Sequence, residues 1–314
     1  MFGDAVRQTA FAATRDQNVL VVISLRGGLD GLGMVVPHGD PGYYAARPGI
    51  AVPRESLVAR DDLFGLHPGM QKLEWLYAAG ELAAVHAVGV VQPNRSHFLA
   101  MEEIEDADPT SSVRRGWVNR MIGLNATSST SEAIHLTSPI VPTMLVGSAP
   151  TLSADRLERI ALSGATDSWT ARRRRQLQTV WGKIPGSLGE AARSALETVE
   201  RLAPVAAEKY VPHSGVDYPT DWPASDLSAA LRAPPTRSGR TPASRSCPST
   251  TGRGTCTATT AGGPGSAGQA RRRDLAVTTD YRNVLGEIIT SRFPDRSVGK
   301  VFPGLTYRPL GIMA

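Results

Sequence analysis

Residues 232–273 lack every large hydrophobic side chain, every aromatic residue and every acid. The 42 positions hold only Arg, Pro, Ala, Gly, Ser, Thr, two Cys and one Gln. Such a composition cannot bury an apolar face, so nothing offsets the conformational entropy lost on folding. We therefore expect a disordered, low-complexity tract between two segments of ordinary composition.

The basic character of the chain comes from the same tract. It holds eight arginines and no acid, and without them the formal net charge falls from +5 to −3. Surfaces that bind nucleic acid combine Lys and Arg with aromatic residues on a folded domain. Because the tract has no aromatic residue, the sequence argues against a nucleic-acid partner.

Cysteine and long apolar runs are scarce as well. The two cysteines, Cys247 and Cys256, lie in the tract at a spacing that matches no metal-ligand pattern. The chain also has no H-x-H, H-x-x-x-H or D-x-x-x-H pair, so local spacing indicates no zinc site. No apolar run approaches the roughly 20 residues of a transmembrane helix, and residues 1–17 show no export signal.

Outside the tract the pattern is that of an α/β protein. Apolar, β-branched runs predict strands buried on both faces, and stripes at helical spacing predict helices. The expected strands are residues 18–25, 82–91 and, more weakly, 140–147; the expected helices are 68–79, 98–106, 167–180, 188–202 and 281–293; residues 274–279 are a short strand or loop. The order strand, loop, helix, strand favours a mostly parallel sheet flanked by helices.

These elements predict four parts of the chain. Residues 1–17 are an N-terminal segment, 18–231 are the first part of an α/β domain, 232–273 are the tract, and 274–314 are the rest of the domain. The glycine-rich turn at residues 27–33 has the order G-G-x-x-G-x-G and leads into an extended segment, which argues against a nicotinamide oxidoreductase. Four consecutive arginines at 172–175 predict a solvated helical face rather than an anion site.

Two residues combine reactive chemistry with a suggestive place. Asp30 follows the first expected strand, and Ser96 follows a later one at the start of a helix. Ligands of open α/β sheets bind beyond the carboxyl ends of the strands. There a carboxylate can hold a metal ion, and a hydroxyl at a helix N-terminus can attack phosphorus or sulfur. Asn94, Arg95 and His97 flank the serine and are candidate substrate-binding residues.

Structural roles compete with this chemistry. Serine before a helix is most often a cap, and aspartate in a glycine-rich turn is most often a turn former. Ser96 has Leu99 three residues on, where a capping box would need Glu or Gln. Both roles stay open for Ser96 and for Asp30.

Three segments carry a resemblance to a known family. They contain R-G-G-L-D-G, L-H-P before a helix, N-R-S-H-F, and D-L-A-V-T-T-D-Y-R-N-V-L-G-E-I-I. Together they resemble a bacterial family without an assigned reaction, domain of unknown function 1501. That family is similar in fold to the alkaline phosphatase and sulfatase superfamily. The resemblance covers residues 18–231 and 274–310. Members of the family often carry a twin-arginine export signal.

The resemblance implies a metal-dependent phosphate or sulfate ester hydrolase in intact relatives. Asp30 matches the first-strand carboxylate that binds a divalent metal, and Ser96 matches the nucleophile. The family carries its other ligands in W-D-x-H, S-E-F-G-R and D-H-G segments, and none of the three occurs in this chain. One carboxylate does not hold a catalytic ion. We therefore expect an incomplete alkaline-phosphatase-like domain that binds no metal and is inactive; the alternative is a non-catalytic scaffold or binding protein.

The genetic code offers a reason for the missing segments. Codons compatible with residues 245–257 can spell V-V-S-V-D-Y-G-S-W-D-M-H when read two nucleotides out of phase. In the same phase, residues 237–243 permit I-R-A-D-x-G and residues 259–265 permit H-G-R-W-P-G. This predicts a frameshift near Leu231, an internal loss near Ala258 and a return to phase near Asp274. The hypothesis requires that the gene spell W-D-M-H in the shifted frame.

Overall fold

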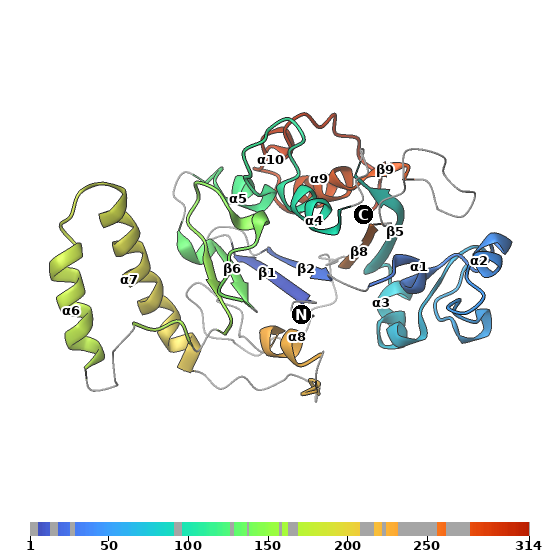
Figure 1. Ribbon diagram of the computed structural model, residues 1–314, viewed down its shortest axis with the longest axis horizontal. Coiled ribbons are helices and arrows are strands. Elements are labelled where there is room, and N and C mark those ends of the chain that lie inside the picture. Colours follow the sequence, from blue (N-terminus) through green and yellow to red (C-terminus); the bar gives the residue numbers. More distant parts are fainter. Residues whose placement is uncertain are drawn as a thin grey trace. The chain divides into compact units, whose positions relative to one another are not determined.

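The computed structural model describes residues 6–12, 18–25, 29–90, 96–125, 129–136, 138–156, 159–162, 169–207, 217–221, 224–231, 256–261 and 277–313. The chain forms two compact units, each made from two parts of the sequence. The first combines Met1–Gly27 with Val113–Thr241, and the second combines Gly28–Ser112 with Pro242–Ala314. Both contain helices and strands, which agrees with an α/β chain (Figure 1).

The first unit is built on a four-stranded sheet. β1 is antiparallel to both of its neighbours, whereas β6 and β7 are parallel. Ile134 and Leu136 of β6 are buried and pack with Leu202 of α7 and Ala230 of α8. In spatial order the strands are β2 (Val19–Leu25), β1 (Val6–Ala12), β6 (Ala133–Leu136) and β7 (Leu152–Ala154). The helices are α5 (Trp117–Ile122), α6 (Thr170–Trp181), α7 (Gly186–Ala207) and α8 (Ala224–Leu231).

Strand β2 confirms the strand expected at residues 18–25 but not its surroundings. Its odd-numbered side chains are exposed, with Val19 at 55% and Ile23 at 47%, and they alternate with half-buried ones. Among the described strands β2 pairs with β1 alone, and the pair is antiparallel. The prediction of a strand buried on both faces, in one parallel sheet with residues 82–91, is therefore wrong. A β-branched run favours a strand without fixing how many of its faces are covered.

Residues 140–147 form no strand, contrary to the prediction. They contain the 3-10 helix η4 (Thr143–Leu145), in which Leu145 N donates to the carbonyl of Pro142 at 2.9 Å. Proline fixes its φ and has no N–H for a strand partner, so it favours a turn here. Met144 and Leu145 are still buried, and this burial explains the apolar run.

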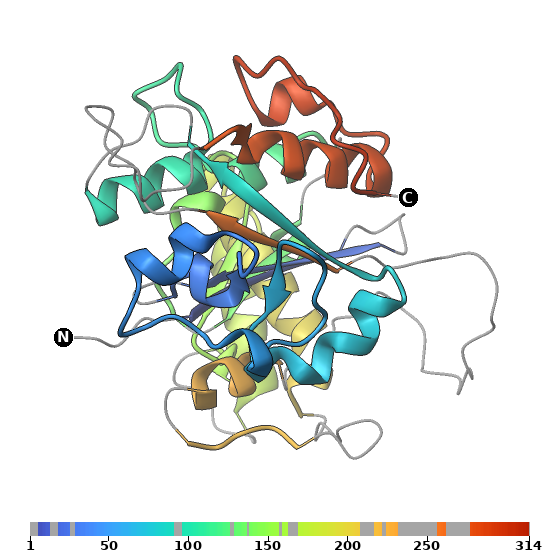
Figure 2. The same cartoon turned by 90° about the vertical axis from the view of Figure 1, so that its right-hand side faces the viewer.

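The second unit contains a three-stranded parallel sheet. β5 (Leu82–Gly89) lies between β8 (Cys256–Ala261) and β9 (Thr279–Asp280), and Figure 2 shows β5 beside β8. The strand expected at residues 82–91 is thus confirmed as far as Gly89. β8 is formed by six residues of the tract for which we expected disorder. The other residues of that tract lie outside the described part of the chain.

Short helices complete the second unit. The helix expected at residues 68–79 is a 3-10 helix over its first half and an α-helix over its second, and it ends before Gly80 at a φ of +71°. A two-stranded antiparallel pair, β3 (Val35–Val36) and β4 (Gly65–Leu66), packs against it. The helices are α1 (Gly31–Met34), α2 (Pro41–Ala46), η1 (Arg54–Ser56), η2 (Pro68–Leu73), α3 (Glu74–Ala78), α4 (His97–Asp106), α9 (Tyr281–Arg292) and α10 (Val298–Val301).

A tight turn in the second unit is held by both side chains and backbone. The carboxylate of Asp61 accepts hydrogen bonds from Phe64 N at 2.5 Å and Leu63 N at 2.8 Å. Nε2 of the buried His38 donates to the carbonyls of Asp61 and Phe64, at 3.0 and 3.1 Å. The bond from Phe64 N is the main cause that lowers the pKa of Asp61 below its ordinary value of 3.8, against a smaller opposite effect of burial.

This turn gives a pH dependence of known sign. Because the pKa of Asp61 is lower in the folded chain, the turn stabilises the fold above pH 3.8 and loses that contribution as the pH falls through the folded pKa. In the variant Asp61→Asn, we expect the urea midpoint of unfolding to decrease less steeply with falling pH below 3.8 than it does in the wild type. The exposed neighbour Asp62→Asn is the matched control and should leave the slope of the wild type. Equal slopes in all three proteins would contradict the prediction.

Candidate functional site

Asp30 lies at the start of the short helix α1. Its Oδ1 accepts a hydrogen bond from Leu32 N at 3.3 Å, which makes it the N-cap of that helix. The guanidinium of Arg47 forms an ion pair with the same carboxylate, with Nη2 at 3.2 Å from Oδ1 and Nη1 against Oδ2. Arg47 also lies over the ring of Tyr43, 5.8 Å from its centroid. Both oxygens of the expected metal ligand are therefore engaged by a cation and a backbone amide.

Ser96 is the N-cap of α4. Its Oγ accepts a hydrogen bond from Leu99 N at 3.3 Å, so the capping role weighed from the sequence is present without a capping box. His97 is the first residue of the helix and is exposed. The other two candidate substrate-binding residues, Asn94 and Arg95, lie outside the described residues.

A second acid lies at the carboxyl edge of the parallel sheet. Asp280 is the last residue of β9, and in the register of the sheet it is paired with Gly89, the last residue of β5. From Gly89 the chain runs on to Ser96 and α4. Ligands of open α/β sheets bind beyond the carboxyl ends of the strands, so Asp280 lies in this sheet where we expected Asp30 to lie. The signal was present in the sequence, as an aspartate between the segment V-T-T and a helical stripe.

Asp280 is paired with an arginine too. Nε of Arg282 lies 3.1 Å from both carboxylate oxygens, and Nη2 lies 2.6 Å from Oδ2. The two side chains are only 12% and 9% exposed. Burial alone would lower the pKa of Arg282, but the hydrogen bonds and charge of Asp280 outweigh it and the pKa is raised. Arg282 therefore stays charged, and its guanidinium contacts both carboxylate oxygens of Asp280.

The described residues do not fit a divalent metal. They contain no group of three or more His, Cys, Asp or Glu side chains placed to hold one ion. Asp30 and Asp280, the two acids with the right topology, each face a guanidinium that would repel a dication. Catalytic zinc sites need about three protein ligands, with further groups that orient them.

Comparison with known proteins adds no relative: no family model, no curated protein and no solved structure matches the chain. The family resemblance therefore stays a prediction that rests on the motifs. No helix within the described ranges is long and apolar enough to cross a membrane.

Proposed function

We propose that the chain is a phosphatase- or sulfatase-like domain without a working metal centre, and that it does not hydrolyse esters. The pairing of Asp30 with Arg47 carries the proposal, because this carboxylate was the one ligand that the motifs left to the chain. The three motif segments with the other ligands are absent from the sequence. The alkaline-phosphatase-like fold is part of the proposal, and the parallel order of β8, β5 and β9 supports it.

The role of Ser96 follows from the same geometry. In an active relative the serine would attack the ester, and a bound divalent ion would polarise the ester oxygen. Here Oγ accepts the N–H of Leu99 and caps α4. We infer that this serine stabilises a helix and attacks no substrate.

Two substitutions separate the cap from the nucleophile. Ser96→Ala removes both the cap oxygen and the hydroxyl, and loss of a cap costs about 1 kcal/mol of stability. Ser96→Asp removes the hydroxyl but keeps an oxygen that can cap the helix. We expect Ser96→Ala alone to lower the unfolding free energy in urea. All three proteins should show the same background hydrolysis of aryl phosphate and aryl sulfate with added zinc, manganese or magnesium.

The contrary result is equally specific. Metal-dependent turnover by the unmodified chain that disappears in both Ser96 variants would show a working nucleophile. Whole-number occupancy of a divalent metal in the purified chain would likewise contradict the proposal.

The second candidate function, a binding protein on the same scaffold, is favoured by one observation: the exposed basic face of α6.

A further inference from the structure

Helix α6 carries a strongly basic face that the ester-hydrolase proposal does not use. The helix has four consecutive arginines and no acid, and Arg172, Arg173 and Arg175 are exposed. Trp169, immediately before the helix, is 54% exposed, and Val180 near its end is 59% exposed. We call these five residues the arginine face.

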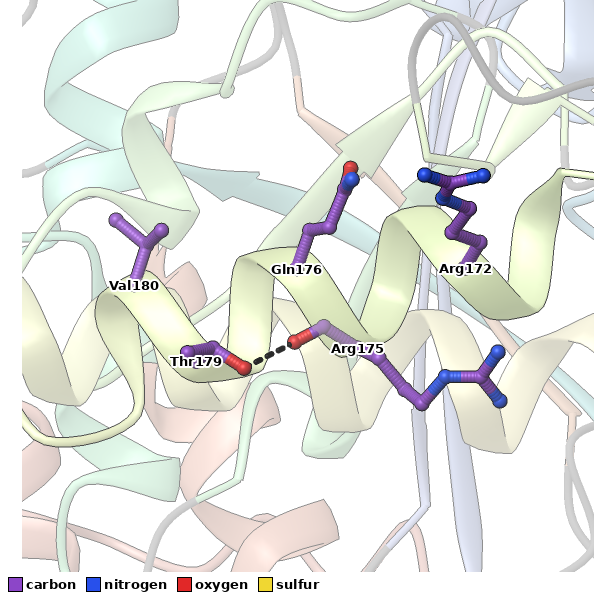
Figure 3. A pocket seen from close by; sticks show the side chains of 5 residues that line it. All are labelled: Arg172, Arg175, Gln176, Thr179 and Val180. Atoms are coloured by element: carbon purple, nitrogen blue, oxygen red, sulfur yellow. Dashed lines mark hydrogen bonds between the residues drawn. The ribbon is translucent and has the colours of Figure 1, made fainter.

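Part of the arginine face borders a shallow hollow of about 610 Å³. Arg172, Arg175, Gln176, Thr179 and Val180 line it. Figure 3 shows Arg172 and Gln176 projecting to one side of α6, while the Thr179 hydroxyl donates back to the carbonyl of Arg175 at 2.8 Å. The hollow is thus bordered by two guanidinium groups, with one apolar side chain at its far end.

The opposite side of α6 is fixed to α7, so the face has a defined support. Arg174, the fourth arginine, is turned toward α7, and its Nη1 lies 2.9 Å from Oε1 of Glu200. Arg193 of α7 donates to the carbonyls of Gly182 and Ile184 in the connecting turn, at 3.2 and 3.0 Å. Figure 1 shows the two helices running side by side. The exposed arginines therefore project from an anchored helix.

The mixture of charge and apolar surface indicates the kind of partner. The guanidinium of Arg172 lies over the Trp169 ring, 4.9 Å from its centroid, so one face of the indole is already occupied. A single-stranded nucleic acid would have only the other face of that ring for base stacking. Val180 is exposed, and so is Leu188 at the start of α7 (63% exposed). These aliphatic side chains form neither hydrogen bonds nor ion pairs with phosphodiesters. Trp and aliphatic side chains beside arginines suit the boundary between lipid headgroups and acyl chains.

We infer that the arginine face docks the protein on the surface of a bilayer that contains anionic phospholipid. The arginines pair with headgroup phosphates and carboxylates, and Trp169 and Val180 enter the interface. This is peripheral binding through one helical hairpin. Membrane binding does not depend on whether the chain hydrolyses esters. The hydrolysis assays can therefore contradict the proposed function without contradicting this inference, and the binding test can do the reverse.

The test is co-sedimentation of the full chain with phosphatidylcholine vesicles, with and without phosphatidylserine. Each arginine near an anionic surface contributes about 1 kcal/mol, so the double variant Arg172→Gln/Arg175→Gln should bind about 30-fold more weakly. The matched control Lys300→Gln/Arg308→Gln removes two exposed charges from the second unit and should bind like wild type. Trp169→Ala should give a smaller loss on the same vesicles.

Several outcomes decide the inference. The inference is supported if the chain binds only the vesicles that contain phosphatidylserine, and if added salt weakens this binding. The double variant Arg172→Gln/Arg175→Gln should weaken it too, whereas the control variant should not. Salt titration of the unmodified chain gives the same evidence if a variant fails to fold. No binding to anionic vesicles overturns it, and so does an equal loss in the arginine pair and its control. Binding to a single-stranded oligonucleotide in place of vesicles overturns it in favour of a nucleic-acid surface.

Discussion

Glu287→Ala should lower the free energy of unfolding by about 2–4 kcal/mol, since one charged acceptor of several buried hydrogen bonds is lost. Glu287 lies on α9 with 5% of its surface exposed. Its Oε2 accepts from Leu310 N at 2.6 Å and Gly311 N at 3.0 Å. Its Oε1 accepts from Ile312 N at 2.6 Å and Met313 N at 2.9 Å. Four consecutive amides thus close around one carboxylate and hold the segment after α10 against α9.

The measurement should read this segment directly. In hydrogen exchange, the amides of residues 310–313 should lose protection in Glu287→Ala while the amides of α9 keep theirs. Glu287→Gln should lie between the two proteins, because its amide keeps one acceptor oxygen and turns an NH₂ toward two of the donors. Glu197→Ala, at an exposed glutamate of α7, is the matched control. Unchanged protection of residues 310–313 would show that the carboxylate does not hold the segment.

Local signals in the sequence located the longer helices α4, α6, α7 and α9, whereas α5 and α8 were not predicted. α4 and α9 begin where Ser96 and Asp280 cap them, and both helices agree with the expected ranges to within one residue at each end. The strands were harder, because their pairing depends on partners that are distant in sequence. β1 contains Gln8 and Thr9 within its seven residues, so no apolar run marked it. Without β1, the antiparallel pairing of β2 could not be foreseen.

The same limit applies to the candidate site. The sequence placed Ser96 before a helix, as observed, whereas it placed Asp30 in a turn and the structure has this residue as the N-cap of the short helix α1. What it could not supply was the partner of each group. Arg47, which pairs with Asp30, comes 17 residues later and lies in none of the helices or strands that the sequence predicted. The amides around Glu287 come 23 to 26 residues after it and have no side-chain signal at all.

Gly116→Ala should destabilise the first unit by more than about 3 kcal/mol, beyond the usual cost of overpacking. Gly116 precedes α5 with φ −61° and ψ 144°, a backbone conformation that alanine adopts readily. An added Cβ, however, would lie 2.1 Å from the carbonyl carbon and oxygen of Met144. Those atoms belong to η4, whose residues Met144 and Leu145 are buried, so the backbone there has little room to move.

The effect is steric, and a second glycine isolates it. Around Gly49 an added Cβ meets nothing within 4 Å, so Gly49→Ala should change stability by no more than about 0.5 kcal/mol. Thermal and urea unfolding of both variants, followed by tryptophan fluorescence because Trp117 of α5 is buried, compare the two sites. Gly116→Ala should also disturb the hydrogen bond from Gly116 N to Val146 O, which is 2.8 Å long. Equal midpoints for the two variants would mean that η4 yields to the methyl group, and α5 would then not be packed against it as tightly as the 2.1 Å approach requires.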